Sequence, residues 1–198
     1  MLPFLAAVAL AFGAIFIAEF GDKSQLLILA FATRYAARPV VLGLVLAAAA
    51  IQGVSVAVGA AAGAALPQTA VAIVSGVAFL AVAAWTLRGA HDDNEALRES
   101  ARADRQLAGA ALVLTVAATF IVSELGDKTM LATFALAASQ GALPTWIGST
   151  AGEVAANLVA VAIGRQVGHR LSLRVVRIGS AALFAVAGVG VLLGVLLP

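Results

Sequence analysis

Long runs of Ala, Val, Leu and Gly fill most of this chain, and they restrict its fold more than any other feature. The chain is 63% hydrophobic and only 11% charged, so it has too few charged residues to cover a water-soluble domain. In lipid, only helices and closed barrels satisfy all of their backbone hydrogen bonds. The runs do not alternate polar with apolar residues, so we expect an all-α integral membrane protein and not a barrel.

The apolar runs divide into six stretches, each of which is predicted to be a transmembrane helix. Their approximate bounds are 3–33, 39–63, 69–88, 108–139, 144–164 and 174–197. A helix over the first stretch would be about 46 Å long, whereas the hydrocarbon core is about 30 Å thick. The first and fourth stretches must therefore tilt, kink or protrude, and their midpoints place Glu19 and Glu124 near the bilayer centre. An alternative ends the first span at Ala18 and puts the next residues in a surface loop.

Two similar charged segments interrupt the apolar runs, EFGDKSQ over 19–25 and ELGDKTM over 124–130. They lie 105 residues apart, and the same offset continues without a gap. It aligns Pro39 with Pro144, Gly43 with Gly148, Gln52 with Asn157, Gly59 with Gly164, Ser75 with Ser180 and Phe79 with Phe184. The sequence therefore predicts two three-helix repeats, over 1–88 and 108–198, joined by a hydrophilic linker over 89–107.

The number of helices in each repeat is odd, so the second repeat must enter the membrane from the opposite side. Threading the six helices places ten arginines on the face that holds the linker, and no Lys or Arg on the other face. These are Arg34, Arg38, Arg88, Arg98, Arg102, Arg105, Arg165, Arg170, Arg174 and Arg177. The positive-inside rule then makes 88–107 cytoplasmic and both termini external, or periplasmic, in a multi-pass protein of the cell (inner) membrane.

The charged segments carry the residues that are expected to do chemistry. On a continuous helix, Glu19 and Asp22 would share a face, and Lys23 would follow Glu19 by four residues, the favourable order for an ion pair. The second segment repeats this pattern with Glu124, Asp127 and Lys128. The lysines could simply neutralise the glutamates, or they could take part in function. Ionisable groups in mid-membrane are costly and by default mark a transport or proton pathway.

The formal charges of the two segments indicate the kind of ligand. Each segment holds two carboxylates and one ammonium group, so the two together carry a net charge of −2, which matches a divalent cation. Further oxygen donors are available in Ser24, Gln25, Thr129, Gln52 and Asn157. An all-oxygen shell suits calcium, magnesium or manganese. Both histidines fall in predicted loops and Cys is absent, so zinc, copper and nickel are disfavoured.

Buried carboxylates also bind protons readily, because desolvation favours their neutral form and a bound cation favours their ionised form. One site can therefore hold either a cation or protons, and inverted repeats around a midplane site provide alternating access. Glu153 is a further acid without a partner, since its equivalent in the first repeat is Ala48. It is interpreted as an additional ligand, a proton carrier, or an acid satisfied by its polar neighbours.

The doubled motif E-x-G-D-K-S/T, once in each half of a six-helix protein, resembles uncharacterised protein family 0016. This is the GDT-type family of Ca²⁺/Mn²⁺:H⁺ exchangers, which includes Golgi manganese/calcium transporters and bacterial manganese exporters. The resemblance covers the whole chain. It implies calcium or manganese transport against protons, with Glu19, Asp22, Glu124 and Asp127 as metal ligands. Ser24, Gln25 and Thr129 follow as motif members, and Met130 departs from the polar residue of the first copy.

The leading hypothesis is a secondary antiporter, and not an enzyme, that exports Mn²⁺ or Ca²⁺ from the cytoplasm in exchange for protons. It needs no permanently bound cofactor. Its partners would be the cation, protons and the lipid bilayer, and a net charge of +2 gives no reason to expect nucleic acid. The alternatives are a passive divalent-cation channel with the same acids as a selectivity ring, and an intramembrane aspartyl protease using Asp22 and Asp127. The oligomeric state is not predicted.

Overall fold

The computed structural model describes residues 2–20, 22–88, 107–167 and 173–196, and these residues form helices with no strand among them. The predicted all-α class is thus confirmed, while most of the predicted linker lies outside the described residues. The helices in chain order are α1 (Leu2–Glu19), α2 (Lys23–Arg34), α3 (Ala37–Ala65), α4 (Gln68–Arg88), α6 (Gly109–Glu124), α7 (Lys128–Gln140), α8 (Ala142–Val167) and α9 (Leu173–Leu196).

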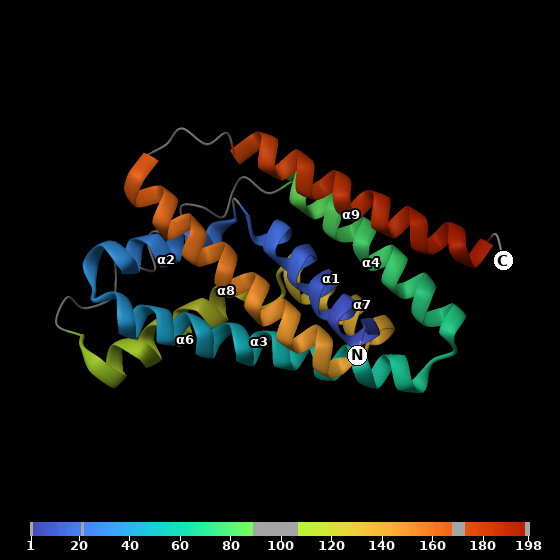
Figure 1. Cartoon of the computed structure of the whole chain (residues 1–198), viewed down its shortest axis with the longest axis horizontal. Helices are drawn as coiled ribbons and strands as arrows, with labels where there is room; N and C mark the ends of the chain where they lie inside the picture. The colour runs from blue at the N-terminus through green and yellow to red at the C-terminus, as the bar shows by residue number, and fades with distance from the viewer. Residues whose placement is uncertain (1, 21, 89–106, 168–172, 197–198) are drawn as a thin grey trace.

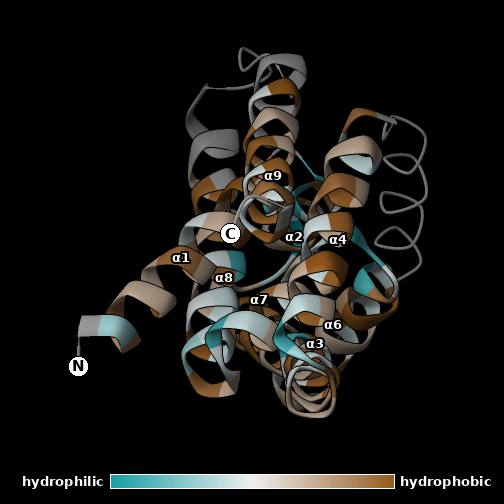
Figure 2. Cartoon of the chain, turned by 90° about the vertical axis from the view of Figure 1, so that its right-hand side faces the viewer, coloured by the Kyte–Doolittle hydropathy of each residue, from teal (hydrophilic) through white to brown (hydrophobic). Residues whose placement is uncertain are grey.

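The described residues contain two helices that are long and apolar enough to cross a membrane, Ala37–Ala65 and Gln68–Leu87. Two more spans are obtained if the pairs α1–α2 and α6–α7 are each counted as one bent span. Most residues of the helices are apolar (Figure 2), and exposed side chains include Leu46, Val58 and Leu114. The six predicted spans are therefore represented by two to four candidates within the part of the chain that the structure describes.

Neither long apolar stretch forms one continuous helix. The axis turns by 77° between α1 and α2, and by 80° between α6 and α7. In the second break Gly126 has φ of +77°, a backbone conformation that L side chains rarely adopt. The excess length of these stretches is accommodated by a sharp bend, and each bend lies within a charged segment.

The two halves of the chain interlock (Figure 1). Helix α3 packs against α6 and α7, α8 packs against α1 and α2, and α4 lies along α9. Small residues allow the close approach: a Cβ added at Gly152 of α8 would lie only 2.5 Å from the carbonyl oxygen of Phe12 on α1. Each bent helix pair is therefore held mainly by a long helix from the other half.

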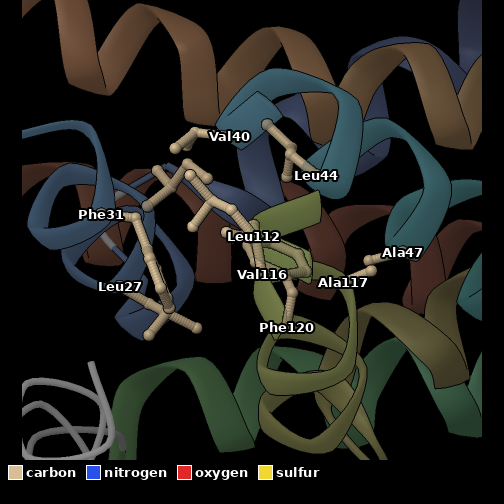
Figure 3. Close-up of a cluster of buried hydrophobic side chains, with 10 residues drawn as sticks. Leu27, Phe31, Val40, Leu44, Ala47, Leu112, Val116, Ala117 and Phe120 are labelled. Carbon is tan, nitrogen blue, oxygen red and sulfur yellow. The ribbon is translucent and has the colours of Figure 1, made fainter. Parts of the chain in front are cut away.

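Two clusters of buried apolar side chains hold these helices together. One joins α2, α3 and α6 and includes Phe31, Leu44 and Phe120 (Figure 3). The other joins α1, α4, α7 and α9 and includes the ring pair Phe79–Phe184, whose centroids are 6.0 Å apart. Both clusters mix helices from the two halves, so neither half would bury its apolar faces alone.

The tight contact between α1 and α8 makes a prediction about stability. Gly152→Ala is expected to lower the melting temperature, because overpacking a tight contact costs about 1–3 kcal/mol and forces the two helices apart. Gly13→Ala is the matched control, since a Cβ there meets no atom within 4 Å and Ala favours the helix. Thermal unfolding of the purified protein in detergent checks this, and equal melting temperatures for the two variants would contradict the packing described.

Candidate cation site

The acidic residues of the chain fall into two groups. Those of the first group lie in the linker between positions 92 and 104. The others are Glu19, Asp22, Glu124, Asp127 and Glu153. These five come from both halves of the chain, interact electrostatically, and lie among buried polar side chains between the helices. Every acid outside the linker therefore belongs to one polar region inside an apolar protein.

The two helix breaks place the carboxylates. Glu19 is the last residue of α1 and Glu124 is the last residue of α6. In each break the Asp backbone N–H donates to the Glu carbonyl oxygen, from Asp22 at 3.1 Å and from Asp127 at 3.0 Å. Carbonyl groups at one helix end and N–H groups at the next helix start thus converge, and both kinds of group bind ions. The same backbone hydrogen bond from Asp to Glu therefore occurs in both motifs.

Three of the four predicted metal ligands lie together. One oxygen atom from each of Glu19, Glu124 and Asp127 lies within 4.8 Å of the others. Glu19 and Glu124 are completely buried and Asp127 is 5% exposed. Asp127 is the N-cap of α7, yet its side chain makes no capping hydrogen bond. The surface-loop alternative for the first segment is wrong, because Glu19 and Ser24 have no exposed surface.

The motif hydroxyls bind the glutamates and leave one oxygen of each without a partner. Ser24 Oγ donates to Glu19 Oε2 at 2.7 Å, and Thr129 Oγ1 donates to Glu124 Oε2 at 3.4 Å. Glu19 Oε1 and Glu124 Oε1 are buried and have no hydrogen-bond partner among the described residues. Burying a carboxylate oxygen costs free energy unless a hydrogen bond or a counter-charge compensates for the lost water. Two such acceptors beside a third carboxylate are suited to bind a cation or protons.

The expected ion pair within the second motif is not formed. The prediction of a pair at positions i and i+4 on one helix was wrong, because the helix ends between Glu124 and Lys128. Lys128 Nζ instead lies 2.5 Å from Asp22 Oδ2, in the other half of the chain. The first motif is broken in the same way between Glu19 and Lys23, but the side chain of Lys23 lies outside the described residues. The fourth predicted ligand, Asp22, is thus held by a lysine and is not part of the three-carboxylate group.

The remaining predicted residues lie around this group and make other contacts. Gln25 donates to the Ala156 carbonyl at 3.3 Å, and its counterpart Met130 accepts from the Gly126 N–H at 3.2 Å. Asn157 Nδ2 donates to the Glu153 backbone carbonyl at 3.0 Å. These contacts tie the motifs to α8 and to their own turns.

A hydrogen-bonded chain holds the acid that has no counterpart. Gln52 Nε2 donates to Glu153 Oε2, and Gln52 Oε1 accepts from Thr133 Oγ1 at 2.6 Å. Thr133 was not among the predicted residues. It follows Thr129 by four positions on α7, so helical spacing could have identified it as part of the same face.

Comparison with known proteins adds to this geometry. The family model described as divalent cation/proton antiporter GDT1 matches residues 7–94 and 112–197, which is most of the chain. The chain belongs to the GDT1 divalent cation/proton antiporter family. It is also similar to a protein of Vibrio cholerae serotype O1 named "Putative manganese exporter", with 27% identity over 183 residues, 91% of this chain and 87% of that protein. No solved structure matches the chain.

Membership of the GDT1 family confirms the predicted resemblance and makes this chain a transporter and not an enzyme. The apolar helices and the family together identify a multi-pass membrane protein that transports divalent cations. The protease alternative, which gave Asp22 and Asp127 catalytic roles, is therefore wrong.

The pair that joins the two halves of this GDT1-family protein makes a second prediction. Lys128→Gln should destabilise the protein strongly, by about 3–5 kcal/mol, because it leaves the Asp22 carboxylate without its buried counter-charge. The double variant Asp22→Asn/Lys128→Gln should recover much of that loss, since neither member of the pair is left charged without the other. Unfolding of both single variants and the double variant in detergent gives the coupling energy. Additive losses would show that the two residues do not stabilise each other.

Proposed function

We propose that this chain exchanges a divalent cation for protons, and that Glu19, Glu124 and Asp127 together hold the cation. The observation that carries the proposal is the convergence of these three carboxylates, with one buried oxygen of Glu19 and of Glu124 lacking a hydrogen-bond partner in the described part of the chain. The ligands come from both halves of the chain, so neither half contains the site by itself. Asp22 is held by Lys128 in this conformation and is a ligand only if that pair opens.

The charge and chemistry of the site favour a hard divalent cation. The four motif acids and two motif lysines carry a formal net charge of −2, which one divalent cation balances. The donors are carboxylates, supported by the hydroxyls of Ser24 and Thr129. Oxygen ligands suit manganese and calcium. We place manganese first, supported by the similarity to a protein named as a manganese exporter, and calcium second.

Protons compete with the cation for the same oxygens. When the cation leaves, two protons on the carboxylates restore the charge balance that the cation had provided. In a low-dielectric site, cation release and proton uptake are tightly coupled, because an ionised and empty site would leave several unpaired buried charges. Proton uptake and cation release are therefore linked at one place.

We further propose the arrangement of the chain in the membrane. Six helical segments form two inverted repeats over 1–88 and 108–198, with 89–107 between them, 88–107 in the cytoplasm and both termini outside. The reciprocal packing of α3 on α6–α7 and of α8 on α1–α2 supports the repeat relation. The asymmetric distribution of arginines supports the orientation. In this arrangement the bent spans bring the carboxylates to the membrane midplane, as in other transporters with broken helices.

Transport in proteoliposomes tests the proposal. With an imposed pH gradient, the protein should move Mn²⁺ against its own gradient, and an opposite proton flux should accompany it. Asp127→Asn should abolish both fluxes, because it removes a ligand charge without changing side-chain size. Asp104→Asn, the same chemical change in the linker, is the control and should transport normally.

The same experiment separates an exchanger from a passive channel. A channel would let Mn²⁺ run down its gradient with no proton movement and would not respond to the pH gradient. Repeating the assay with Ca²⁺ ranks the two cations. Normal Mn²⁺ transport by Asp127→Asn would disprove the proposed ligand set.

A further inference from the structure

Helix α8 carries a buried polar face that the cation site does not use. Thr145, Ser149, Glu153 and Asn157 follow one another at intervals of four residues, so their side chains lie along one face of the helix. All four have no exposed surface. We name these four residues the α8 polar stripe.

The stripe is not satisfied by protein contacts. Thr145 Oγ1, Glu153 Oε1 and Asn157 Oδ1 are buried and have no hydrogen-bond partner among the described residues. Ser149 Oγ makes one local contact, to the carbonyl oxygen of Trp146 at 3.4 Å. Buried polar groups normally bind protein groups or ordered water, and water is the partner that a row of unsatisfied oxygens accepts most readily. The unsatisfied oxygens of the stripe are therefore suited to bind a row of water molecules.

The corresponding face in the first half of the chain is apolar at three of its four positions, and only Gln52, the equivalent of Asn157, is polar. The positions equivalent to Thr145, Ser149 and Glu153 are Val40, Leu44 and Ala48. Val40 and Leu44 pack into the apolar cluster between α2, α3 and α6 (Figure 3). The fold therefore does not need polar residues at these three positions, and the polar run from Thr145 to Glu153 is a property of the second half alone.

The stripe leads from an exposed helix end to the carboxylates. Residues 141–143, at the start of α8, are exposed, and Thr145 lies about one turn further along. At the inner end, Gln52 holds Glu153 in place through its amide. Glu153 has no ion pair among the described residues and is not part of the three-carboxylate group.

The charged groups around Glu153 are mostly acids. Glu19 from α1, Glu124 from α6 and Asp127 from the start of α7 interact with it electrostatically. Lys128 of α7 is bonded to Asp22, α2 ends in the exposed Arg34, and α3 contributes only the neutral Gln52 at this point. Glu153 is thus an acid beside the cation site, at the end of a polar path.

We propose that the α8 polar stripe conducts protons between the exposed start of α8 and the cation site, with Glu153 as the transfer group. The inference rests on the proposed exchange of a cation for protons. When the cation leaves, the O–H bond of protonated Glu153 breaks and its proton forms a new O–H bond on a motif carboxylate. Glu153 then regains a proton along the stripe. Protons and cations reach the site by different routes, and the proton route exists in one half only.

Two transport assays on the same proteoliposomes test this. The first measures Mn²⁺ movement driven by a pH gradient, which requires net proton transfer. The second measures exchange of isotopic Mn²⁺ for Mn²⁺ at equal pH, which requires none. Glu153→Gln should lower the first rate by about a hundredfold, the low end of what a positioned proton-transfer group contributes. Thr145→Val and Ser149→Ala should lower it less, and all three variants should keep the isotope exchange.

The matched control is Ser55→Ala, which removes a buried hydroxyl with the same kind of local contact, to the Ile51 carbonyl, on α3 and not on α8. It should leave both rates unchanged. Equal loss of both rates in Glu153→Gln would overturn the proposal and make Glu153 a cation ligand or a packing residue. No loss in any stripe variant would also overturn it. A wild-type protein that exchanges isotopic Mn²⁺ but ignores the pH gradient would refute the antiport itself, which is a separate result.

Discussion

The burial of carboxylates is the constraint on which the rest of this structure depends. Removing an ionised carboxylate from water is costly unless a counter-charge and hydrogen bonds replace the lost hydration. Here Glu19 and Glu124 are completely buried, and the protein supplies only part of that replacement. Hydroxyls bind one oxygen of each, and Lys128 neutralises Asp22. In the proposed function, a divalent cation or protons balance the remaining negative charge of the carboxylates.

The arrangement of helices is related to the need to balance these buried charges. A continuous helix would commit its backbone groups to internal hydrogen bonds, whereas a sharp break exposes N–H and C=O groups where the carboxylates lie. The chain makes two such breaks, and the long helices of each half pack against the broken helices of the other. The apolar clusters pack the broken helices against α3, α4 and α9. Stability and the cation site therefore rest on the same contacts between halves.

The sequence was sufficient to predict the helical class. It also singled out the acids that the structure brings together, because charged residues stand out in an apolar chain and repeat at a fixed offset. It predicted that the two long stretches tilt, kink or protrude, but not that each breaks at its motif, since the spacing from Glu124 to Lys128 fits an unbroken helix equally well. The positive φ of Gly126 and the bond from Lys128 to Asp22 depend on packing between distant segments. Spacing along a single helix contains no information about that packing.

The central claim is that the two motifs form one shared cation site, and counting sites tests it most directly. Equilibrium titration of the purified protein with Mn²⁺ should give one site per chain. Glu19→Gln alone and Glu124→Gln alone should each remove that site, because each contributes a ligand to the same cation. Two sites per chain in the wild type, with each variant losing only one of them, would contradict the account.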